Sequence, residues 1–100
     1  MVKHTILWTL DDTLSSSELI RVKEDMKTSL EALNGRIEGL LELRIYINPM
    51  PTANCDVMLE SLFASKEALA FYATHPEHVA IADSKVRPYT KSRLCMDCEI

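Results

Sequence analysis

The side chains best suited to chemistry gather in one short segment, Tyr72–His78, which holds a tyrosine, two histidines and a glutamate around Pro76. Histidine titrates near neutral pH, so His78 could act as a general base on an acidic carbon. Tyr72 could donate a hydrogen bond to the enolate oxygen that develops in such a reaction. The pattern therefore favours an aldol-type role in which Tyr72 and His78 are the candidate catalytic pair.

The same segment also has a purely structural interpretation, which stays open beside the catalytic one. His75 could cap a helix that begins at Pro76, while His78 packs or hydrogen-bonds locally. Outside the segment, His4 and Trp8 share one face of an alternating run, from which His4 could reach the same pocket or fill an ordinary structural role. Trp8 is equally suited to the core. His4, Trp8 and His75 are kept as candidate ligand-binding residues.

We expect neither a metal site nor a cofactor. The two histidines of the segment lack the spacing of a common zinc motif, even with Glu77 or His4 as a further ligand. Cys95 and Cys98 have the spacing of a redox or zinc pair, yet residues three apart on an extended strand point to opposite faces. The chain has no phosphate-binding loop, nucleophile elbow or dinucleotide-binding motif.

Composition indicates a single globular domain spanning residues 1–100. The chain is 47% hydrophobic and 26% charged, with only two glycines and four prolines, which is not the usage of a disordered tail. Its net charge is −4 and its basic residues are scattered, so we expect no nucleic-acid or membrane partner. Three cysteines, an odd number, favour reduced thiols and a cytoplasmic location.

Hydrophobic periodicity predicts the elements that must position the candidate residues. Alternation of apolar and polar residues predicts strands at residues 2–10, 41–47, 56–63 and 92–100. Apolar residues spaced by three or four predict a helix from the capping box of Ser15 and Glu18 to about Leu33, with Gly35 as its stop. Further helices are predicted at residues 66–74 and 76–86, separated by the break at His75–Pro76.

This order predicts an α+β fold of the ferredoxin-like, split βαβ kind, with a four-stranded antiparallel sheet and the helices on one face. The other face of the sheet is left uncovered. Depending on the register, it would carry residues as apolar as Trp8 or Ile45, and exposed patches of that kind mark interfaces or ligand sites. We therefore predict a homodimer packed sheet to sheet.

The opening Val2–His4 strand, the segment Tyr72–Val79 and the closing acidic and apolar strand together resemble the stress-responsive A/B barrel (Dabb) family. The resemblance covers nearly the whole chain, and His75–His78 is its most specific part. It implies a dimer whose two sheets form an α/β barrel, with a pocket between the sheet and the helices of each subunit. The family includes plant stress proteins, bacterial proteins of unknown role and a plant polyketide cyclase.

In that cyclase a tyrosine and the second histidine of the motif act on a linear polyketide, so the resemblance implies the same pair here, Tyr72 and His78. The Pro49–Asn54 loop does not look like the plant enzyme, so the substrate does not carry over. We expect a dimer that binds a small apolar, phenolic or polyketide-like molecule near this pair. A non-catalytic stress-response or structural dimer, and a cofactor-free cyclase, lyase or monooxygenase, are the alternatives; whether the protein is an enzyme stays open.

Overall fold

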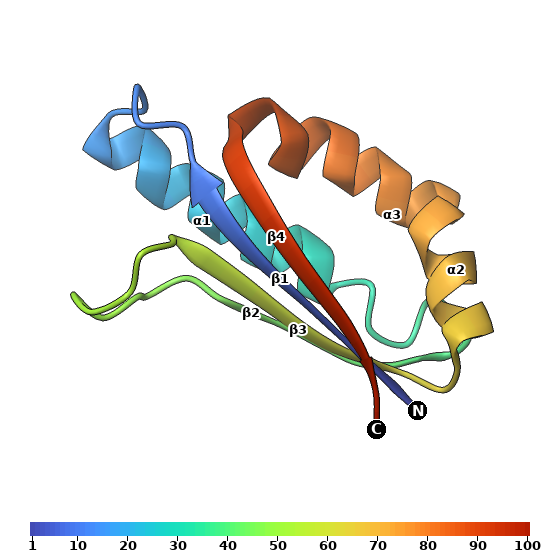
Figure 1. Ribbon diagram of the computed structural model, residues 1–100. Coiled ribbons are helices and arrows are strands. Elements are labelled where there is room, and N and C mark those ends of the chain that lie inside the picture. The colour runs from blue at the N-terminus through green and yellow to red at the C-terminus, as the bar shows by residue number, and fades with distance from the viewer.

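The computed structural model describes residues 1–100 and shows the predicted order of strands and helices (Figure 1). The strands are β1 (Val2–Leu10), β2 (Leu40–Tyr46), β3 (Val57–Phe63) and β4 (Thr90–Glu99). The helices are α1 (Ser16–Glu31), α2 (Lys66–Thr74) and α3 (Pro76–Ile81). The chain continues from α3 through a π-helical turn, η1 (Ala82–Val86), and a 3-10 turn, η2 (Arg87–Tyr89). All predicted boundaries except that of the third helix lie within two residues of these ends.

The strands form one antiparallel sheet in the order β2-β3-β1-β4, and the helices lie on one of its faces (Figure 1). This arrangement confirms the predicted ferredoxin-like fold. The hydrophobic core fills the space between the sheet and the helices, and the two chain ends lie together at one end of β1 and β4. No helix has the length and apolar character needed to cross a membrane.

The capping box predicted at the start of α1 is present in full. The Ser15 hydroxyl accepts a hydrogen bond from the Glu18 N–H at 3.2 Å, and the Glu18 carboxylate accepts one from the Ser15 N–H at 3.0 Å. Val22, Met26 and Leu30 form the buried stripe of the helix. Local hydrogen-bonding chemistry therefore sets where α1 begins, and burial of the stripe holds it on the sheet.

A β-bulge near the start of β2 changes which residues of this strand are buried. The register against β3 shifts between Leu40 and Glu42. Leu41 is consequently 53% exposed, whereas Leu40, Leu43 and Ile45 are buried. The simple alternation of Leu41 with Leu43 and Ile45 predicted from the sequence is wrong at its first position, because the extra residue of a bulge reverses the face on which a side chain lies.

The observed register decides which residues occupy the uncovered face. Trp8 and Ile45 lie on the helix-covered face and are buried. The prediction that residues such as these two would lie on the uncovered face is therefore wrong. The apolar residues that instead lie on the open face are Leu7, Tyr46, Met58, Leu62, Leu94 and Met96. Leu94 and Met96 are 71% and 67% exposed, so this face carries apolar side chains that no layer within the chain covers.

Gly39 allows the loop before β2 to pass directly beneath α2. Its φ of +87° is favourable only for glycine, and a Cβ at this position would lie 2.5 Å from the Cβ of Ala68. This close approach fixes α2 against the end of the sheet and so positions the helix that carries Tyr72.

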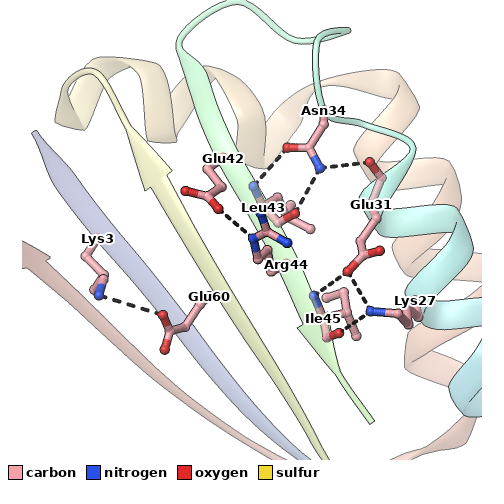
Figure 2. A network of polar contacts seen from close by, with 9 residues as sticks. All are labelled: Lys3, Lys27, Glu31, Asn34, Glu42, Leu43, Arg44, Ile45 and Glu60. Carbon is pink, nitrogen blue, oxygen red and sulfur yellow. Dashed lines mark hydrogen bonds and ion pairs between the residues drawn. The ribbon is translucent and has the colours of Figure 1, made fainter.

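Side chains from α1 and the turn after it cover the outer edge of β2 (Figure 2). The Asn34 amide accepts from the Leu43 N–H at 2.9 Å and donates to the Leu43 carbonyl at 2.8 Å. In the same way Glu31 accepts from the Ile45 N–H at 3.0 Å, and Lys27 donates to the Ile45 carbonyl at 2.8 Å. The outward backbone groups of Leu43 and Ile45 on this edge strand are therefore occupied.

Candidate functional site

A cavity of about 530 Å³ opens between the helices and the sheet. Every helical element of the chain and three of its strands contribute to the wall. The lining residues are Ile6, Trp8, Leu30, Leu59, Tyr72, His78, Ala82, Val86, Arg87, Thr90 and Arg93. A volume of this size and a largely apolar wall with a few polar groups are typical of small-molecule sites, for which roughly 300–1,000 Å³ is usual.

The break between α2 and α3 determines how His78 is held. Pro76 interrupts the helix, and the Glu77 N–H donates to Nδ1 of His75 at 3.1 Å instead of to the carbonyl of Ala73. The Ala73 carbonyl is thus free, and it lies 3.3 Å from Nδ1 of His78. The capping role proposed for His75 is what the structure shows, and the same break creates the acceptor that orients His78.

The contact with Ala73 also fixes the tautomer of His78. A carbonyl oxygen can only accept a hydrogen bond, so Nδ1 of His78 carries the proton and donates it. In the neutral ring, Nε2 is then the nitrogen with a free lone pair. Burial lowers the pKa of His78 from its ordinary value of 6.5, against the opposing effect of the bond to Ala73. His78 is therefore a neutral base at neutral pH.

Tyr72 is 2% exposed and lies against His78, with the two ring centroids 4.2 Å apart and the rings tilted by 35°. Phe63 packs on Tyr72, with the ring centroids 5.0 Å apart. The Tyr72 hydroxyl is buried and has no hydrogen-bond partner within the protein. Burial raises the pKa of Tyr72 well above its usual range, so the hydroxyl stays protonated as a donor.

Of the other three predicted site residues, one lines the cavity and two do not. Trp8 lines the cavity and is buried. His4 is buried beside the cavity but does not line it, and its ring stands edge-on to Phe63 and Tyr72 at centroid distances of 6.2 and 6.4 Å. His75 lies outside the cavity, where its ring meets Phe71 at 5.5 Å. Tyr72, His78 and Trp8 are thus brought to one cavity, with His4 behind them.

Three polar residues of the cavity wall were missed by sequence reasoning: Arg87, Thr90 and Arg93. Arg87 pairs with Asp83 on the preceding turn, whereas Arg93 takes part in none of the ion pairs of the chain. Arg93 reaches the cavity because it lies opposite Trp8 in the register of β1 and β4. No local sequence pattern encodes that register, so no signal in the chain could have identified it.

Comparisons with known proteins agree with this fold. Residues 2–100 match the sequence profile of the stress-responsive A/B barrel domain. A dimeric protein of unknown function from Bacteroides fragilis, described as having a ferredoxin-like fold, is 34% identical with a TM-score of 0.91, covering 99% of this chain and 95% of its own. A Dabb family protein from Mesorhizobium loti is 26% identical with a TM-score of 0.76 and the same coverage.

A hydroxynitrile lyase from Passiflora edulis is 15% identical with a TM-score of 0.73, covering 99% of this chain and 92% of its own. At that identity the likeness shows the fold alone. No curated protein matched the chain.

Proposed function

The chain belongs to the stress-responsive A/B barrel family, and we propose that it is a homodimer that binds a small apolar, phenolic or polyketide-like molecule in the cavity beside Tyr72 and His78. The observation that carries the proposal is that Tyr72 lines the cavity while its buried hydroxyl has no partner in the protein. An unsatisfied buried hydroxyl costs about 1–3 kcal/mol, so a ligand oxygen that accepts a hydrogen bond from it is favoured there.

The remaining wall indicates the kind of molecule that fits. Ile6, Leu30 and Leu59 supply an apolar surface for a hydrocarbon or aromatic body. On β4, Arg93 supplies a cation that forms no ion pair in the protein. A phenol or carbonyl compound that also carries an acidic group would satisfy the Tyr72 hydroxyl and Arg93 together.

The geometry of His78 favours a second function, cofactor-free cyclase or lyase chemistry in the same cavity. Its Nε2 is available to remove a proton from a carbon next to a carbonyl group, and the Tyr72 hydroxyl can stabilise the oxygen that becomes negative. This is the aldol-type role inferred from the sequence. It requires the same binding mode as the first proposal. His78 would remove the proton, the enolate carbon would add to a second carbonyl of the same molecule, and the alkoxide formed would take the proton back from His78.

The proposed homodimer is supported by two observations. The Bacteroides fragilis relative, at 34% identity, is described as dimeric. The open face of this chain carries an apolar surface that nothing within the chain covers, including Leu94 and Met96. A second copy facing this surface would remove it from water.

Binding can be followed with the protein's own fluorescence, because Trp8 is the single tryptophan and lines the cavity. We expect hexylphenol and hexylbenzoate to change the Trp8 emission in a saturable way. Tyr72→Phe should weaken hexylphenol binding about tenfold, the equivalent of one hydrogen bond. Arg93→Gln should weaken hexylbenzoate more than hexylphenol, because it removes the cation that pairs with the carboxylate.

Tyr46→Phe is the matched control for the tyrosine variant. Tyr46 lies on the open face, away from the cavity, and the substitution should leave both affinities unchanged. Emission that does not respond to either compound, or equal losses in Tyr72→Phe and Tyr46→Phe, would contradict binding at this site.

A further inference from the structure

Three potential metal ligands meet beside the cavity, where β1 and β4 run together. His4 lies opposite Asp97, and Ile6 opposite Cys95, so all three polar side chains extend toward the helix-covered face. Nδ1 of His4, Sγ of Cys95 and a carboxylate oxygen of Asp97 all lie within 4.8 Å of one another. The cysteine and the aspartate stand two residues apart on β4, which is the spacing that keeps strand side chains on one side.

The distances within this group are close to those of a tetrahedral metal centre. Sγ of Cys95 lies 3.7 Å from Nδ1 of His4 and 3.5 Å from Oδ1 of Asp97. Zinc bonds of ordinary length at tetrahedral angles separate a sulfur from a nitrogen or oxygen ligand by about 3.6 Å. For an ion to enter, the direct hydrogen bond between His4 and Asp97 must open and the Cys95 thiol must release its proton to solvent.

A nucleophilic cysteine fits the same residues poorly. In a cysteine–histidine–aspartate triad the nucleophile and the acid bind different nitrogens of the ring, whereas here both approach Nδ1 of His4. Partial burial raises the pKa of the Cys95 thiol, and the Asp97 carboxylate raises it further. The group therefore lacks the electropositive setting that activates a thiolate.

We propose that His4, Cys95 and Asp97 bind one divalent transition-metal ion, with Zn²⁺ as the best match. Imidazole, thiolate and carboxylate are all established zinc ligands, and the thiolate disfavours magnesium and calcium. Three protein ligands leave a fourth position for water. This site is distinct from the motif histidines His75 and His78, for which the sequence gives no zinc spacing.

Neighbouring side chains hold His4 in place beside Cys95 and Asp97. Its ring is held edge-on by Phe63 and Tyr72, and its backbone carbonyl accepts a hydrogen bond from the Ser61 hydroxyl at 2.9 Å. Cys95 lies on the outer strand of the sheet and is exposed, so an ion can reach the group from solvent. The two negative charges of thiolate and carboxylate outweigh the single positive charge of nearby Arg93.

Cobalt(II) is a coloured stand-in for zinc and tests the proposal directly. With the reduced protein, we expect a thiolate-to-cobalt charge-transfer band that saturates at one equivalent per chain and is displaced by Zn²⁺. Cys95→Ser should abolish the band, and Asp97→Asn should weaken cobalt binding at least about tenfold. Cys98→Ser is the matched control, because Cys98 lies opposite Lys3 on the other face of the sheet.

Absence of a saturable band in the wild-type chain would overturn the proposal. So would a band that survives Cys95→Ser in a variant with unchanged far-ultraviolet circular dichroism, or one that disappears in Cys98→Ser. Both cysteines are exposed, so neither substitution removes a core contact, and the comparison between them measures the face on which the ion binds.

Discussion

His78 owes its tautomer to a break in the helix that carries it. Pro76 and the His75 cap leave the Ala73 carbonyl without a backbone donor, and the imidazole takes that place. A residue pair six positions apart would not share a face on a continuous helix, but across this break Tyr72 and His78 lie ring against ring. The motif thus has a structural residue, His75, and a residue with a free ring nitrogen, His78, which is the base in the proposed chemistry.

The pH dependence of proton abstraction tests His78 at the residue scale. Benzoylacetone has an acidic carbon between two carbonyl groups, and the wild-type chain should accelerate exchange of its proton for deuterium about a hundredfold over buffer. The reaction needs neutral His78. Because burial lowers the pKa of His78 below 6.5, the acceleration should persist at pH 6.5 and fall only as the pH drops through that lowered value.

His78→Gln should remove this acceleration, measured by proton NMR, at every pH. His75→Asn is the control, because asparagine also caps helices and His75 lies outside the cavity. Exchange that is unaffected by His78→Gln, or that is lost equally in His75→Asn, would rule out His78 as the base.

Among the elements, β2 and β4 are the two outer strands of the sheet, and they differ in whether side chains hydrogen-bond to the backbone of the outer edge. The outer edge of β2 is closed by Asn34, Glu31 and Lys27, which take up the backbone groups of Leu43 and Ile45 (Figure 2). The exposed ion pairs drawn beside them, Lys3–Glu60 and Glu42–Arg44, stabilise the fold little because solvent screens them. The edge of β2 is thus closed by neutral and charged hydrogen bonds to backbone.

Replacing the side chains that close this edge should destabilise the fold. Asn34→Ala removes both hydrogen bonds to Leu43, and we expect it to lower the free energy of unfolding by about 1–3 kcal/mol in urea titrations. Glu24→Ala is the control on the neighbouring helix, since Glu24 is exposed and makes no hydrogen bond or ion pair; its effect should stay within about 0.5 kcal/mol. Equal stability of the two variants would contradict the edge-closing role.

At the scale of the whole molecule, the chain exposes one apolar surface and one open edge. The helices cover a single face of the sheet (Figure 1). The opposite face carries Leu94 and Met96, and also the exposed ion pair of Lys3 with Glu60. Since the edge of β2 is closed, the sheet cannot continue into a second copy there. The open face and β4 are the surfaces left for the proposed homodimer.

Light scattering should give twice the chain mass for the wild-type protein at micromolar concentration. Leu94→Glu should yield a monomer, because it places a charge without a partner among the apolar side chains of the open face, beside Leu7. Ile20→Glu is the control: Ile20 is 58% exposed on α1, on the other side of the molecule, and the variant should remain dimeric. A wild-type monomer, or a Leu94→Glu dimer, would contradict sheet-to-sheet packing.

The sequence by itself determined what depends on neighbouring residues. The capping box of Ser15 and Glu18, the break at His75–Pro76 and the alternation along β1 are local patterns, and each predicted where an element begins to within two residues. The order of the elements then gave the ferredoxin-like fold. The segment Tyr72–His78 was also recognisable, because its residues are consecutive in the chain.

Only the tertiary structure decided which residues, distant in the sequence, lie close to that segment and its cavity. Asp97 meets His4 across 93 positions of the chain, and Arg93 reaches the cavity only through the pairing of β4 with Trp8 on β1. A shift of one residue in that pairing would turn Arg93, Cys95 and Asp97 to the opposite face. The bulge in β2 shows the same effect, since one extra residue exposed a leucine that alternation predicted as buried. Register depends on packing of the whole sheet, and no local pattern specifies it.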